Sequence, residues 1–166
     1  TVKKIREKTK KILDVHLMIQ PVHQSIKDFI EAGSDIISFH PEADPNPVKI
    51  ITQIKDAKIK PGIAIHPKIS VSEIEYLLPK IQQVIVMTVV PGFGGQKFMN
   101  DQVIKIKQLF ELRNKKKYNY EISVDGGIND ETGKICINNG VDILAVGSYL
   151  LSNEQDQYSK IIISLR

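Results

Sequence analysis

The chain has 166 residues, which suits one domain, and its 42% hydrophobic and 25% charged residues are typical of an ordinary globular protein. A single cysteine, Cys136, excludes an internal disulfide framework and favours a reducing, cytoplasmic setting. No apolar run approaches the ~20 residues needed to cross a bilayer, so we expect no membrane partner.

The net charge of +4 comes from two basic clusters that flank predicted helices. Their members are Lys3, Lys4, Arg6, Lys8, Lys10 and Lys11, and then Arg113, Lys115, Lys116 and Lys117. Single-stranded nucleic acid binding would require aromatic side chains among the cations, for stacking on bases. Neither cluster has them, so we interpret both as solvated helix faces and expect no nucleic-acid partner.

Strands and helices alternate along the whole sequence. A basic helical stretch over 2–11 leads into a strand over 12–19. Further strands are predicted at 35–40, 62–66, 84–90, 121–125 and 143–147, with amphipathic helical patterns between them. Strict alternation with short connections predicts parallel strands joined by right-handed crossovers.

Three of these strands end in glycine-rich turns. The run 84–90 leads into Pro91-Gly92-Phe93-Gly94-Gly95-Gln96, the run 121–125 into Gly126-Gly127, and the last strand into Gly147-Ser148. Glycine removes the Cβ atom where the backbone must bend or approach a ligand closely. A loop between a strand end and a helix start presents free N–H groups to an anion. Together the three turns predict one phosphate site built from several strand ends.

The position of these turns favours a barrel. A (β/α)₈ barrel and a doubly wound sheet both carry their active sites at the carboxyl ends of parallel strands, but phosphate loops after the last two strands are typical of the barrel. Only six strands are predicted. Two more β/α units would add about 50 residues and give about 215, inside the usual barrel range. We therefore expect a single, partial (β/α)₈ TIM-barrel domain over 1–166 that lacks its first two β/α units.

Two polar side chains are expected at the catalytic rim. Asp14, His16 and Met18 alternate on one face of the first strand, and Ser123 and Asp125 share a face of the fifth. Alone, His16 would more often be a core histidine, and Asp125 before Gly-Gly more often a turn former. Beside the phosphate loops, however, imidazole and carboxylate indicate half of a site for one divalent metal ion, whether Zn²⁺, Fe²⁺, Mn²⁺ or Co²⁺.

Five segments resemble the ribulose-phosphate 3-epimerase family. In chain order they are LDVHLMI at 13–19, SFHPEA at 38–43, VMTVVPGFGGQKF at 86–98, VDGGI at 124–128 and VGS at 146–148. The PGFGGQ and VDGGI motifs are specific to that family. The resemblance implies a (β/α)₈ barrel of the ribulose-phosphate-binding type that epimerises D-ribulose 5-phosphate at C3, in the pentose phosphate pathway. It also implies a homo-oligomer for the full-length form.

The resemblance also implies roles for individual residues. His16 would be a metal ligand that approaches the substrate, and Asp125 would be both a metal ligand and the proton donor. The sugar phosphate would be held by Gly92, Phe93, Gly94, Gly95, Gly126, Gly127, Gly147 and Ser148. Met18 and Met87 would line the substrate, although a plain core role for both fits their chemistry equally well.

The family's second-strand His-x-Asp pair, which carries the opposing base and another metal ligand, has no counterpart in 1–166. The serine of the family's first strand is also missing, and His66-Pro67 replaces the more usual Asn-Pro. Two alternatives therefore stay open. One is a neighbouring sugar-phosphate epimerase, such as an allulose-6-phosphate 3-epimerase. The other is a non-catalytic remnant that keeps the phosphate loops, and the chain as it stands would then be inactive.

Overall fold

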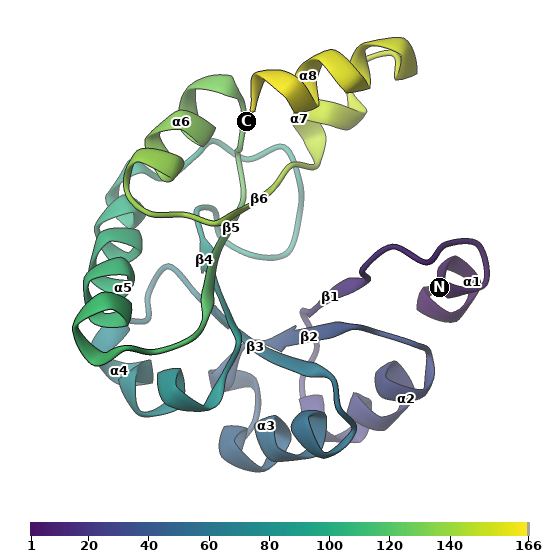
Figure 1. The fold of residues 1–166 in the computed structure, drawn as a ribbon, viewed down its shortest axis with the longest axis vertical. Helices are drawn as coiled ribbons and strands as arrows, with labels where there is room; N and C mark the ends of the chain where they lie inside the picture. Colours follow the sequence, from purple (N-terminus) through teal and green to yellow (C-terminus); the bar gives the residue numbers. More distant parts are fainter. Residues whose placement is uncertain (166) are drawn as a thin grey trace.

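A computed structural model describes residues 1–165 and shows one curled, six-stranded parallel sheet with helices along its outer side (Figure 1). Every strand pairs in parallel with its neighbour in sequence, in the order β1 to β6. The strands are β1 Asp14–Leu17, β2 Ile36–Phe39, β3 Lys60–Ile65, β4 Gln83–Met87, β5 Glu121–Asp125 and β6 Ile143–Ala145. The predicted alternation and parallel pairing are confirmed.

The helices follow the strands in the expected places. They are α1 Val2–Arg6, α2 Ile26–Glu31, α3 Pro47–Asp56, α4 Val71–Ile74, α5 Val103–Lys116, α6 Asp130–Asn138, α7 Ser148–Leu151 and α8 Tyr158–Ser164. Short 3₁₀ turns are η1 Val22–Gln24, η2 Pro41–Ala43, η3 Glu75–Lys80, η4 Asn100–Gln102 and η5 Gln155–Gln157. Within residues 1–165, no helix is long and apolar enough to cross a membrane.

Most predicted elements were too long at their ends. The first helix ends at Arg6 rather than near residue 11, because the Arg6 guanidinium donates hydrogen bonds to the backbone carbonyls of Thr9 and Lys11. These bonds hold the following segment in an irregular turn. The first strand spans only Asp14–Leu17, the stretch in register with Ile36–Phe39 of β2. Only the fifth strand was predicted with its observed bounds.

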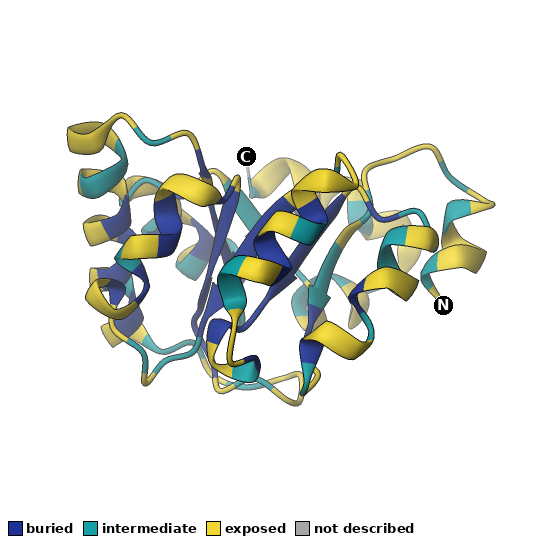
Figure 2. Ribbon diagram, turned by 90° about the horizontal axis from the view of Figure 1, so that it is seen from below, coloured by how far each residue is buried: buried dark blue, intermediate teal, exposed yellow. Residues whose placement is uncertain are grey.

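The main core lies between the sheet and the helices, as the dark blue strands in Figure 2 show. Phe39 of β2, Ile54 of α3 and Val124 of β5 are fully buried there. A small second cluster lies on the inner, concave side of the sheet, where Met87 packs with Ala64, Ile85 and Val89. The inner side is therefore free to carry polar side chains at the strand ends.

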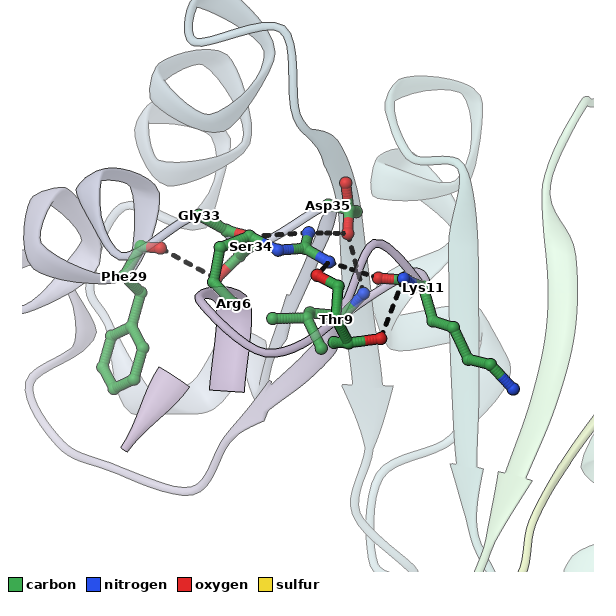
Figure 3. Close-up of polar contacts among 8 residues, drawn as sticks. Arg6, Thr9, Lys11, Phe29, Gly33, Ser34 and Asp35 are labelled. Carbon is green, nitrogen blue, oxygen red and sulfur yellow. Dashed lines mark hydrogen bonds and ion pairs between the residues drawn. The ribbon is translucent and has the colours of Figure 1, made fainter. Parts of the chain in front are cut away.

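An Arg–Asp clasp ties α1 to the sheet (Figure 3). Asp35 Oδ2 accepts hydrogen bonds from Arg6 Nη1 and from the backbone N–H of Leu13, both at 2.7 Å. Arg6 also donates to the Gly33 carbonyl at 3.2 Å. The Asp35 carboxylate therefore links α1 to the segment just before β1 and to the start of β2.

The same arrangement recurs at the other end of the sheet. Asp142, just before β6, accepts a hydrogen bond from the backbone N–H of Ile122 at 2.7 Å and pairs with Arg113 of α5. Arg113 also donates to the carbonyl of Tyr120 at 3.0 Å. The two clasps show that the basic clusters are not wholly solvated faces, because each contributes one structural arginine.

Candidate active site

A cavity of about 710 Å³ opens at the carboxyl ends of the strands. Every residue that the sequence assigned to the site lines it, except His16. These lining residues are Met18, Met87, Gly92, Phe93, Gly94, Gly95, Asp125, Gly126, Gly127, Gly147 and Ser148. The strand order therefore places segments that lie more than a hundred residues apart in sequence around one cavity.

The PGFGGQ loop is fastened at both of its ends. Gln96 donates from its side-chain amide to the carbonyls of Val90 and Phe93, at 2.6 and 2.9 Å. Gly95 donates its backbone N–H to Ser148 Oγ at 3.1 Å, which joins this loop to the turn after β6. Sequence reasoning missed the role of Gln96, although its place inside the specific motif was a usable signal.

The turn after β5 requires its glycines. Gly126 and Gly127 have φ values of +121° and +64°. An added Cβ would lie 2.4 Å from a Val89 methyl at the first position and 2.7 Å from the Phe98 backbone nitrogen at the second. The buried hydroxyl of Thr88 donates to the Gly126 carbonyl at 2.6 Å and holds the turn. Thr88 was another residue that the sequence did not indicate.

His16 and Asp125 meet on the inner face, as their alternation along β1 and β5 predicted. His16 Nδ1 lies 3.7 Å from Asp125 Oδ2, with the two side chains 14% and 36% exposed. The other ring nitrogen of His16, Nε2, lies 3.0 Å from Nε2 of His40 at the end of β2. The imidazole is therefore held between the carboxylate and a second histidine.

The types of side chain in this pair are those that bind divalent metal ions. An imidazole nitrogen and a carboxylate oxygen 3.7 Å apart match the ligand types of Zn²⁺, Fe²⁺, Mn²⁺ or Co²⁺. Within residues 1–165, however, no group of three or more His, Cys, Asp or Glu side chains converges on one point. The chemistry of the two side chains fits a divalent ion, and the described residues offer two side chains that could bind one.

The two methionines differ in their surroundings. Met18 is 49% exposed at the cavity edge, whereas Met87 is 1% exposed and belongs to the inner apolar cluster. Met87 also lines the cavity, so its position is compatible with either role.

The remaining histidines lie outside the cavity lining. His66 Nδ1 accepts the backbone N–H of Lys68 at 3.1 Å, and burial lowers the pKa of this imidazole. The His23 side chain is half exposed, and its Nδ1 lies 2.7 Å from Asp44 Oδ2. Neither supplies an additional ligand beside Asp125.

The fold is that of the TIM-barrel class of parallel α/β proteins. A 3-keto-L-gulonate-6-phosphate decarboxylase from Vibrio cholerae superposes with a TM-score of 0.76 at 18% identity, over 99% of this chain and 75% of that chain. A 3-hexulose-6-phosphate synthase from Salmonella typhimurium gives 0.67 at 20% identity, over 99% and 80%. At these identities the likeness establishes the fold alone, as a curled half-barrel.

Sequence relatives define the family. The model of the Ribulose-phosphate 3 epimerase family matches residues 1–151. The ribulose-phosphate 3-epimerase of Bacillus subtilis is 39% identical over 166 residues, covering 99% of this chain and 76% of that protein. That of Treponema pallidum is 37% identical over 148 residues, covering 89% and 68%. The chain belongs to the ribulose-phosphate 3-epimerase family.

Proposed function

We propose that this protein epimerises D-ribulose 5-phosphate at C3, giving D-xylulose 5-phosphate. The observation that carries the proposal is the approach of His16 and Asp125 beside a cavity that glycine-rich loops line. Relatives named ribulose-phosphate 3-epimerase, at 33–39% identity, support the choice of substrate and reaction.

Asp125 is assigned to proton transfer on one face of C3. The hydrogen on C3 is weakly acidic because it lies beside the C2 carbonyl, so its removal requires a positioned base. Asp125 is the only carboxylate among the described residues that line the cavity. Inversion needs a second acid/base group on the opposite face. We assign that role to the His-x-Asp strand that the family resemblance implies.

His16 and Asp125 would hold one divalent ion, completed by ligands from that same strand. When bound, Zn²⁺, Fe²⁺, Mn²⁺ or Co²⁺ supplies positive charge beside the oxygen atoms that become negative as the C3 proton leaves. His16 Nδ1 and Asp125 Oδ2 lie 3.7 Å apart, so both can approach the same ion. The packed inner cluster around Met87 keeps water from one side of the reacting carbon.

The substrate phosphate is assigned to the loops that meet at Ser148. The Ser148 hydroxyl already accepts one loop N–H, from Gly95, and the backbone around Gly127 and Gly147 lines the same cavity. Backbone N–H groups at such turns bind phosphate without a cationic side chain. Of the open alternatives, a pentose phosphate is favoured over a hexose phosphate by the names of the relatives.

We further propose that the catalytic unit is a closed (β/α)₈ barrel, with two β/α units joining the edges of β1 and β6. The open arc of six strands supports this (Figure 1). A cytoplasmic enzyme is consistent with the buried Cys136 thiol, because burial raises its pKa to about 11 and makes it poorly reactive. The homo-oligomer remains an expectation from the family resemblance.

The test is to incubate the full-length form, with its barrel closed, with ribulose 5-phosphate in D₂O and to follow C3 by proton NMR. An epimerase incorporates deuterium at C3 and forms xylulose 5-phosphate. Binding of the sugar phosphate without deuterium incorporation would identify the non-catalytic remnant. Faster exchange on allulose 6-phosphate than on ribulose 5-phosphate would identify the hexulose enzyme.

A further inference from the structure

A second histidine lies behind His16, and the proposed proton transfer does not use it. His40 is 7% exposed and places its Nε2 3.0 Å from His16 Nε2. Its other ring nitrogen, Nδ1, is buried and has no hydrogen-bond partner of good geometry among the described residues. The Glu42 carboxylate in η2 lies 3.5 Å from that nitrogen. Four side chains thus follow one another in the order Glu42, His40, His16 and Asp125.

We propose that Glu42 and His40 are positioning residues that fix the tautomer of His16, so that its Nδ1 presents a lone pair toward Asp125. The inference rests on the proposed function of His16 and Asp125 as metal ligands and identifies what prepares them for that role.

The Glu42 carboxylate determines the tautomer of His40. A neutral imidazole carries its hydrogen on one ring nitrogen and a lone pair on the other. A carboxylate 3.5 Å from His40 Nδ1 attracts an N–H and repels a lone pair, so His40 carries its hydrogen on Nδ1. Although burial raises the pKa of Glu42, its interaction with His40 and its own backbone N–H lower it overall, which keeps the carboxylate ionised.

The tautomer of His40 then determines that of His16. With its hydrogen on Nδ1, His40 presents a lone pair at Nε2 and accepts the hydrogen of His16 Nε2 across 3.0 Å. His16 is left with a bare Nδ1. The two rings are tilted, with centroids 5.0 Å apart. They therefore meet through their nitrogen-bearing edges and do not stack.

The result is a preformed cation site. A bare imidazole nitrogen faces a carboxylate oxygen at 3.7 Å, and neither atom can donate a hydrogen bond to the other. Two electron-rich atoms in this position favour a cation between them. Loss of such outer partners of a metal-bound histidine lowers metal affinity by ~10–100-fold.

The test measures the tautomers directly, by long-range ¹H–¹⁵N NMR of the metal-free full-length form at about pH 8, which is above the ordinary pKa of a histidine side chain in a peptide. The expected result is hydrogen on Nε2 of His16 and on Nδ1 of His40. Glu42→Gln should mix both tautomers and weaken Zn²⁺ binding by ~10–100-fold. Glu42 is exposed, so the melting temperature should not change. Glu111→Gln, at an exposed position on α5, should change none of these quantities.

Hydrogen on Nδ1 of His16 in the parent protein would overturn the inference. So would an unchanged tautomer and unchanged Zn²⁺ affinity in Glu42→Gln. The tautomer measurement requires no turnover. A protein with the expected tautomers that fails to exchange C3 hydrogen would therefore contradict the proposed function and leave this inference standing.

Discussion

At the scale of single residues, Asp125 carries the largest share of the proposed chemistry. It is the only described carboxylate in the cavity, and it lies beside His16. Asp125→Asn keeps the size of the side chain but removes its negative charge and its titrating proton. We expect kcat to fall by at least ~10³-fold, because general acid/base catalysis and charge stabilisation are both lost. Steady-state kinetics of the full-length form, with and without the substitution, measure this change in kcat.

The matched variant is Ser148→Ala, which removes a hydroxyl from the phosphate side of the cavity. It should raise KM several-fold and leave kcat nearly unchanged. Asp125→Asn should in turn keep its affinity for a non-reactive sugar phosphate, because backbone N–H groups hold that group. Near-normal kcat in Asp125→Asn would show that Asp125 is only a turn residue.

Gly127 tests the phosphate turn. Its φ of +64° costs an L-residue ~1–2 kcal/mol, and an added Cβ would meet the Phe98 backbone nitrogen at 2.7 Å. Gly127→Ala should therefore lower the free energy of unfolding by at least ~1–2 kcal/mol and weaken binding of inorganic phosphate. At Gly94 an added Cβ has only an ordinary contact, 3.4 Å from Ser148 Oγ. Gly94→Ala should retain the parent stability in the same denaturant titration.

At the scale of elements, the repeated Arg–Asp clasp shows how the helices are tied to the sheet. In both copies one aspartate before a strand binds the backbone N–H of the preceding strand region and an arginine of a neighbouring helix. The hydrogen bond from the Leu13 N–H and then the Arg6 guanidinium lower the pKa of Asp35 below its usual range. The ionised form is therefore the one that stabilises the fold.

This direction of the pKa shift predicts a pH dependence. A carboxylate whose pKa is lower in the folded state stabilises the protein fully at pH values above its unfolded pKa, which is about 3.9. This stabilisation is lost as the pH falls through the folded pKa. Asp35→Asn should lower stability at pH 7 by about 1 kcal/mol, allowing for solvent screening of an exposed group. The difference from the parent protein should shrink below about pH 4.

Thermal melts at neutral and acidic pH measure both effects. The control is Asp56→Asn at the end of α3, an exposed aspartate that makes no clasp. It should leave the melting temperature unchanged at either pH. An Asp35→Asn difference that persists unchanged at pH 3 would show that packing, rather than charge, is responsible.

Elements and site residues differed in how well the sequence predicted them. Apolar runs located all six strands, and the glycines that follow three of them predicted loops that line the cavity, because both patterns are local in sequence. The contacts that position the site are between distant segments. His40 touches His16 across 24 residues, and Thr88 holds the Gly126 carbonyl across 38. Such pairs follow from strand register, which a single sequence does not contain.

At the scale of the whole molecule, the sheet has two strands with one partner each. Among the described strands, β1 pairs only with β2, and β6 pairs only with β5. An apolar groove of about 560 Å³ beside β6 is lined by Leu144, Val146 and Leu150. Leu151 and Ile12, near the two edges, are about 70% exposed (70% and 68%).

These edges predict the behaviour of a protein limited to residues 1–166. Unpaired parallel strand edges with nearby apolar side chains favour pairing with another copy. We expect concentration-dependent association in sedimentation velocity experiments. We also expect turnover of ribulose 5-phosphate well below the ~1–10³ s⁻¹ typical of enzymes, because the described residues place only one carboxylate, Asp125, at the cavity, and inversion needs a second acid/base group. A monodisperse monomer that melts cooperatively would show that the arc is self-sufficient. Normal turnover by that monomer would show that Asp125 serves both faces of C3.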